Sequence, residues 1–265
     1  MSHLHEAFAA AKSENRAALI GYLPAGFPSV DGAVDAIRAM VENGVDIVEI
    51  GLPYSDPLMD GPTIQAASEI SLRQGTTVHD VIATAEAVAA TGAPTLVMTY
   101  WSPIERYGVE AFATDLAKAG GVGVITPDLT PEEAQPWIEA TDSAGLDRVF
   151  LVAPSSSAER IDIVCSITTG FVYAASLMGV TGVASVSSAA PALVERTRPH
   201  TSLPVAVGLG VSTAAQAADV AAYADGVIVG SAFVRLLLDA ATPSAGVAAV
   251  GRLAADLAQG VRRAR

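Results

Sequence analysis

The chain has 265 residues, 51% of them hydrophobic, and a formal net charge of −13. This length can bury a large core in one or two domains, and the acidic balance excludes a surface that binds nucleic-acid phosphates or an anionic membrane. The N-terminal stretch lacks the basic and apolar regions of a secretory leader, and no later apolar run approaches the roughly 20 residues that span a bilayer. We therefore expect a cytoplasmic protein in which Cys165, the single cysteine, is a buried apolar residue.

Apolar runs of strand character alternate with amphipathic segments of helical spacing along the chain. This alternation is typical of a (β/α)8 TIM barrel, here a single domain over residues 1–265, with an N-terminal helix at about Leu4 to Lys12. Extra helices are expected after the second and eighth strands. The alternative is an open doubly wound sheet, but the G-x-G-x-x-G fingerprint at the first helix is missing. The expected strands are 18–23, 46–51, 94–100, 121–128, 148–153, 170–176, 204–210 and 226–231.

Glu49 interrupts the apolar run of the second expected strand, just before a loop that contains Asp56 and Asp60. Alternation along a buried strand turns Glu49 either into a core, where it would pair with an internal arginine, or into a site. Burial without a partner raises the pKa of a carboxyl group toward the range that is useful for proton transfer. Glu49 is therefore the first catalytic candidate. For Asp60, the alternative role is that of an N-cap before the helix that follows Pro62.

Glycines follow three neighbouring strands near the carboxyl end of the expected barrel. Gly210 ends the seventh strand, Gly230 ends the eighth, and Gly182 lies in the loop after the sixth. Ser231 opens a short extra helix, whose free N–H groups would suit an anion. The pattern predicts a phosphate site, because the loops after the last two strands form the common phosphate site of this fold. Tight turns and an ordinary serine cap would explain the same residues without a ligand.

The small number of lysines and histidines limits the reaction mechanisms that the chain could use. The only lysines, Lys12 and Lys118, do not lie at a carboxyl end of a strand, as a Schiff-base lysine would. The four histidines form no pair at metal-ligand spacing, so no metal is expected. The reaction then needs a substrate that provides its own electron sink. The loop after the sixth strand, rich in Gly, Ser and Thr, could be a mobile lid or a passive connection, with Thr181 as its best candidate for bonding a carboxylate.

Six sequence blocks, in this order, resemble the alpha chain of tryptophan synthase, and the resemblance covers nearly the whole chain. They read EIGLPYSDPLMDGPTIQ, PDLTPEEA, APSSSAERI, YAASLMGVTG, VAVGLGVS and ADGVIVGSAFV. The resemblance implies a carbon–carbon lyase of tryptophan biosynthesis. It would cleave indole-3-glycerol phosphate by a retro-aldol reaction to indole and glyceraldehyde 3-phosphate, with the protonated indole ring as the electron sink.

The resemblance also implies roles for individual residues. Glu49 would be the general acid and base, and Asp60 would accept the indole N–H and stabilise the positive ring. Thr181 would hold Asp60 when the lid closes. The phosphate would be bound by Gly182, Gly210, Gly230 and Ser231, and the indole and glycerol pocket would be lined by Tyr22, Met98, Ile125 and Tyr173.

A partner is implied as well. The family's alpha chain passes indole to a beta chain, which carries pyridoxal phosphate, in a heterotetramer of two alpha and two beta chains; no cofactor is expected in the present chain. The contact surface is expected near 53–57 and 103–107. A stand-alone lyase, another phosphate-binding isomerase or epimerase, and a non-catalytic activating subunit remain alternatives. The chain departs from the commoner family pattern at Phe27, Ser102, Leu177, Met178 and Leu209.

Overall fold

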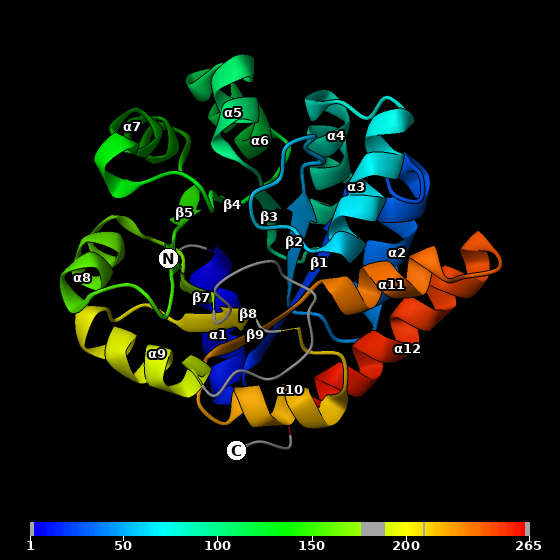
Figure 1. Ribbon diagram of the computed structural model, residues 1–265. Helices are drawn as coiled ribbons and strands as arrows, with labels where there is room; N and C mark the ends of the chain where they lie inside the picture. The colour runs from blue at the N-terminus through cyan, green and yellow to red at the C-terminus, as the bar shows by residue number, and fades with distance from the viewer. Residues whose placement is uncertain (1–2, 176–188, 209, 263–265) are drawn as a thin grey trace.

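The strands form one parallel sheet that curves into a barrel, as expected from the sequence (Figure 1). The computed structural model describes residues 3–175, 189–208 and 210–262. In the described chain, the order of neighbours in the sheet is β5, β4, β3, β2, β1, β9, β8, β7 and β6. The strands are Ala18–Pro24 (β1), Ile47–Gly51 (β2), Thr95–Met98 (β3), Gly123–Ile125 (β4), Asp147–Val149 (β5), Leu151–Val152 (β6), Val172–Ala175 (β7), Val205–Gly208 (β8) and Gly226–Val229 (β9).

The two end strands of this order, β5 and β6, are consecutive in the chain and are interrupted only at Phe150. Strand β5 pairs with β4 on one side and β6 pairs with β7 on the other. The carbonyl of Phe150 also accepts the N–H of Tyr173 at 3.1 Å. The two pieces are therefore one barrel strand, so the eight strands expected from the sequence are confirmed.

The helices form a ring around the strands (Figure 1). Several begin at a side-chain cap, among them Ser29 before α2 and Thr77 before α4. The expected extra helices are present as α3 and α4 after β2 and as α11 and α12 after β9, whereas α5 was not expected. The helices are His3–Ser13 (α1), Val30–Glu42 (α2), Pro62–Arg73 (α3), Val78–Ala89 (α4), Trp101–Tyr107 (α5), Val109–Lys118 (α6), Gln135–Ala144 (α7), Ala158–Ile167 (α8), Ala189–Thr197 (α9), Ala214–Ala221 (α10), Ser231–Leu238 (α11) and Pro243–Arg262 (α12).

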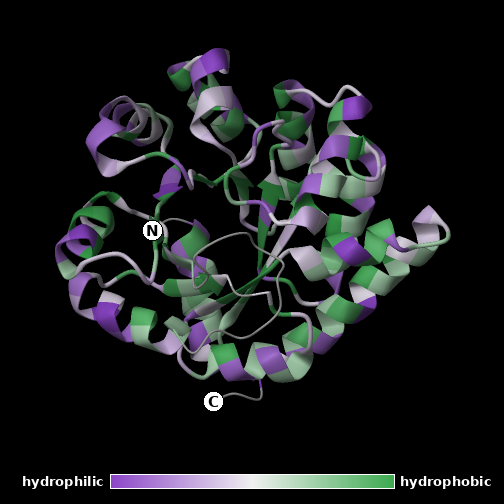
Figure 2. Ribbon diagram, in the orientation of Figure 1, coloured by the Kyte–Doolittle hydropathy of each residue, from purple (hydrophilic) through white to green (hydrophobic). Residues whose placement is uncertain are grey.

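Two apolar layers hold the barrel together, and Figure 2 shows the hydrophobic residues along its strands. The larger layer packs the outer faces of the strands against the surrounding helices and includes Cys165, which is buried as expected. The smaller layer fills the barrel interior, where Leu4 and Phe8 of α1 pack with inward-facing strand residues. Helix α1 therefore closes one end of the interior. In the described part of the chain, no helix is both long and apolar enough to cross a membrane.

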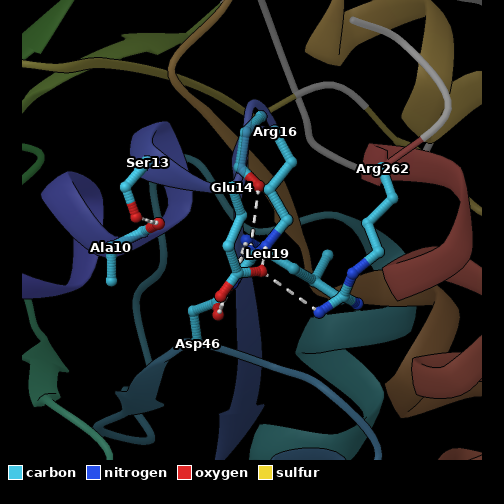
Figure 3. Close-up of polar contacts among 8 residues, drawn as sticks. Ala10, Ser13, Glu14, Arg16, Leu19, Asp46 and Arg262 are labelled. Atoms are coloured by element: carbon cyan, nitrogen blue, oxygen red, sulfur yellow. Dashed lines mark hydrogen bonds and ion pairs between the residues drawn. The ribbon is translucent and has the colours of Figure 1, made fainter.

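An ion-pair network around Arg16 ties this closed end to the rest of the fold (Figure 3). The guanidinium donates to both oxygens of Asp46 at 2.6 and 2.8 Å and to Glu14 at 2.7 Å. Asp46 also accepts the backbone N–H of Leu19 at 2.8 Å. Arg262 of α12 pairs with Glu14 at 3.4 Å. The network thus joins the segment after α1, the loop before β2 and the C-terminal helix.

We expect Asp46→Ala to lower the free energy of unfolding by about 2–3 kcal/mol, because it removes the bidentate partner of a buried guanidinium. The Arg16 side chain is only 6% exposed and that of Asp46 19% exposed, so solvent screens the pair weakly. Urea denaturation measures the change. A matched control is Glu69→Ala, which breaks the exposed pair with Arg73 and should cost under about 0.5 kcal/mol. Equal losses in the two variants would contradict this account.

Candidate active site

Glu49 lies in the middle of β2 with its side chain fully buried. Neither carboxyl oxygen has a hydrogen-bond partner among the described residues. The arginine partner considered as an alternative is therefore not found in the described chain. Burial raises the pKa of Glu49 to about 8, so the group is protonated at neutral pH. A protonated carboxylic acid in an apolar wall can both give and take a proton near neutrality.

Two buried tyrosines flank Glu49. Tyr22 is directly opposite Glu49 in the pairing of β1 with β2. The pKa of Tyr173 is raised mainly by burial and, to a smaller extent, by the charge of Glu49. Glycines make room for both phenols. A Cβ on Gly51 would lie 2.1 Å from the Tyr22 hydroxyl, and a Cβ on Gly208 would lie 2.3 Å from the Tyr173 hydroxyl. These strand-end glycines therefore let both phenols lie near the acid.

Asp60 lies in the loop after β2 and faces the same space. Burial raises the pKa of its carboxyl group, and a hydrogen bond from Tyr100 lowers it. The Tyr100 hydroxyl donates to Asp60 Oδ1 at 3.2 Å and accepts the backbone N–H of Met59 at 2.9 Å. Burial, and after it the charges of Asp60, Tyr100 and Glu49, raise the pKa of Tyr22, so these groups share one site. Asp60 is not the N-cap considered as an alternative, because α3 has Gly61 as its cap.

Tyr100 is a site residue that the sequence analysis missed. The apolar run predicts it as the end of the strand 94–100, but β3 ends at Met98 and Tyr100 is the N-cap residue of α5. Asp128, after β4, holds the start of this helix by accepting the Trp101 N–H at 2.9 and 3.1 Å. Burial and the charge of Asp60 raise the pKa of Tyr100 to about 12, so its hydroxyl remains a donor. Its local sequence carries no signal for this role, because its partner Asp60 lies 40 positions earlier in the chain.

The remaining described candidates are two residues of strands β3 and β4 and three residues that follow strands β8 and β9. Met98 and Ile125 are paired across β3 and β4, and Ile125 is fully buried in the interior layer. Gly230 is the N-cap of α11 without a side-chain cap bond, and Ser231 is the first helical residue, not the cap. Gly210 has a φ of 55°, a left-handed conformation that favours glycine. Among the residues that the structure describes, no side chain caps the first N–H groups of α11, so they can meet an anion.

Several sequence candidates lie outside the described residues, namely Thr181, Gly182, Leu177, Met178 and Leu209. Of the other departures from the family pattern, Phe27 is buried in the outer apolar layer and Ser102 lies in α5. Within the described ranges, no three His, Cys, Asp or Glu side chains gather as metal ligands would.

A groove of about 440 Å³ lies between the loop after β2, the start of α4 and helix α5. Pro53 and Tyr54 line one wall, and Pro103 and Tyr107 line the other. Leu58, in the same loop, has 74% of its surface exposed, which is unusual for a large apolar side chain. The groove coincides with the two segments where the sequence analysis expects a partner.

The fold and the buried acid together define a (β/α)8-barrel enzyme, whose chemistry belongs at the carboxyl ends of the strands. The family model for the tryptophan synthase alpha chain matches residues 8–262. The alpha chain of Thermobifida fusca is 58% identical, with 100% of this chain and 99% of the relative covered. That of Streptomyces coelicolor is 59% identical, with 98% and 96% covered. The chain belongs to the tryptophan synthase alpha chain family.

Solved structures agree with this assignment. A tryptophan synthase structure from Mycobacterium tuberculosis superposes with a TM-score of 0.93 at 54% identity, covering 98% of each chain. The alpha subunit from Legionella pneumophila superposes with a TM-score of 0.90 at 31% identity, covering 99% of each. The expected fold and family are confirmed. The chain is a lyase of tryptophan biosynthesis, which converts indole-3-glycerol phosphate to indole and glyceraldehyde 3-phosphate.

Proposed function

We propose that Glu49 and Asp60 are the proton-transfer and charge-stabilising groups with which this chain cleaves indole-3-glycerol phosphate. The observation that carries the proposal is the fully buried Glu49 carboxyl, whose pKa is raised to about 8 beside a second carboxyl group, Asp60. Two carboxyl groups in different environments can hold different protonation states at one pH, which separates an acid from an anion.

Glu49 starts the reaction as the protonated acid and gives its proton to C3 of the indole ring. The ring nitrogen then carries positive charge. The Glu49 carboxylate removes the proton from the glycerol hydroxyl next to the ring, and the hydroxyl carbon becomes the aldehyde carbon. The bond between C3 and that carbon breaks, and its electrons neutralise the ring to give indole. Glu49 ends protonated, so one residue serves as acid and base in a single turnover.

Asp60 acts as the carboxylate that accepts the indole N–H. It is needed in the ionised form, because the charge that develops on the ring is positive. Burial disfavours this form, whereas the Tyr100 hydroxyl favours it by donating to the carboxylate. Tyr100 therefore acts as a positioning residue that keeps Asp60 ionised and oriented. Thr181 is proposed to share this task.

The phosphate is bound at the start of α11, by the backbone of Gly230 and Ser231 together with Gly210 and Gly182. The uncapped N–H groups of this helix support the assignment. Tyr22, Met98, Ile125 and Tyr173 are proposed to line the indole and glycerol pocket.

The family assignment implies a beta-chain partner. We propose that it docks on the groove beside α5 and on Leu58, an exposed apolar side chain of the loop that also provides Pro53 and Tyr54 to the groove. The assembly would be a cytoplasmic heterotetramer of two alpha and two beta chains, with pyridoxal phosphate in the beta chain and none in this one. Indole released here would pass to that chain.

Turnover of indole-3-glycerol phosphate by the purified chain, alone and with a beta chain, tests the proposed coupling to that partner; the roles of Glu49 and Asp60 are tested by the variants Glu49→Gln and Asp60→Asn. We expect measurable cleavage by the chain alone and a rise in kcat of at least about tenfold with the partner. The reason is that the bound beta chain would help the site to close around the substrate. Activity that the partner leaves unchanged would favour a stand-alone lyase. If the beta chain is activated but no indole-3-glycerol phosphate is cleaved, the result would favour a non-catalytic, activating role for this chain.

A further inference from the structure

Two aromatic rings connect the groove beside α5 to the Asp60 carboxylate. The side chain of Tyr54 lines the groove, and its ring centroid lies 5.3 Å from that of Tyr100, with the planes inclined at 35°. Tyr54 is half-buried, whereas Tyr100 is only 4% exposed. A ring pair at this separation restricts where each ring can lie. A change at the groove surface therefore reaches a buried residue of the site.

The hydroxyl of Tyr100 contacts the Asp60 carboxylate directly, so this contact depends on the position of the Tyr100 ring. Its distance of 3.2 Å to Asp60 Oδ1 is at the long end for a hydrogen bond between oxygens, so a small outward shift of the ring would break it. The backbone around the ring is held by other contacts, since Asp128 accepts the Trp101 N–H. The ring of Tyr54 lies against the Tyr100 ring itself.

We propose that Tyr54 is a positioning residue for the cleavage reaction. Its ring holds Tyr100 where the hydroxyl reaches Asp60, so that whatever fills the groove sets the orientation of the Asp60 carboxylate. The occupant is the partner chain, and this part of the inference rests on the function proposed above. Tyr54 and Tyr100 are both residues of this chain, so the role of Tyr54 can be tested without the partner.

The test is a double-mutant cycle on kcat for indole-3-glycerol phosphate, with Tyr54→Leu, Tyr100→Phe and the double variant in the full chain. If Tyr54 acts through Tyr100, each single variant loses about tenfold in kcat with KM changed less than about twofold, and the double variant loses no more than Tyr100→Phe alone. Tyr54→Phe keeps the ring and should behave like the unaltered chain. Tyr54→Met, which fills the space without a ring, replaces Tyr54→Leu if that variant does not fold.

Losses that multiply to about a hundredfold in the double variant would overturn the proposal, because a packing role for Tyr54 would act independently of Tyr100. Wild-type activity in Tyr54→Leu would overturn it as well. Absence of cleavage by the unaltered chain would overturn the proposed function, so the two failures are distinguishable.

Discussion

Glu49→Gln should lower kcat for cleavage of indole-3-glycerol phosphate by at least about a thousandfold, since one carboxyl group is assigned both proton transfers and general acid–base catalysis contributes about 10²- to 10⁴-fold. The amide has the same shape as the acid but neither gives nor takes the proton. A steady-state assay of indole release measures the loss. KM should change little, because other residues are proposed to hold the phosphate and the ring of the substrate. Activity within tenfold of the unaltered chain would reject Glu49 as the acid and base.

The variant Glu49→Gln also tests the raised pKa of Glu49, through the pH dependence of the free energy of unfolding. A carboxyl group whose folded pKa is raised stabilises the fold least at high pH, because the unfolded chain releases the proton first. With the pKa of Glu49 near 8, the free energy of unfolding of the unaltered chain should fall by about 2–4 kcal/mol between pH 5 and pH 8 relative to Glu49→Gln. Urea denaturation at both values measures this difference. Parallel pH dependence in the two proteins would mean that Glu49 is ionised in the fold.

Asp60→Asn should lower kcat by about 10²- to 10³-fold, because the amide oxygen can still accept the indole N–H but no longer opposes the positive charge on the ring. The loss should be larger in kcat than in KM, since the charge develops only as the ring is protonated. Single-turnover and steady-state kinetics separate the two quantities.

The matched control for this change is Asp35→Asn, which removes one negative charge from the exposed face of α2. Its kinetics should be those of the unaltered chain. Equal losses in Asp60→Asn and Asp35→Asn would assign the effect to the overall charge of the protein. A loss confined to KM in Asp60→Asn would make Asp60 a substrate-binding group without a role in the chemical step.

The barrel was predictable from the sequence because its elements are defined locally. Buried parallel strands read as apolar runs, and helices cover them with an apolar face at every third or fourth residue. Glu49 was equally visible, since a carboxyl group within such a run breaks the pattern. The division of the fifth strand at Phe150 was not predicted, because it arises from a change of pairing partner, from β4 to β7.

The residues that support the candidate site were not predictable in the same way. Tyr100 bonds Asp60 across 40 positions of the chain, and no local pattern encodes that contact. Its place at the end of an apolar run made it resemble a strand residue. The glycines were predicted as phosphate ligands, yet a Cβ on Gly230 would lie 3.0 Å from the Tyr22 ring. Glycine at this strand end thus has a packing reason that depends on a residue more than 200 positions away.

The helix that closes the barrel interior also bears on the depth of the pocket. Phe8 of α1 lies 5.6 Å from Phe171, measured between ring centroids, and Phe171 lies 6.5 Å from Tyr173. This row of rings runs from the N-terminal helix to the wall of the catalytic space, and Ile125 belongs to the same apolar cluster. Residues of α1 therefore pack below the residues that are proposed to line the substrate pocket. Engineering that aims at a bulkier or smaller ring system could alter this packing from below and leave every group around the reacting atoms unchanged.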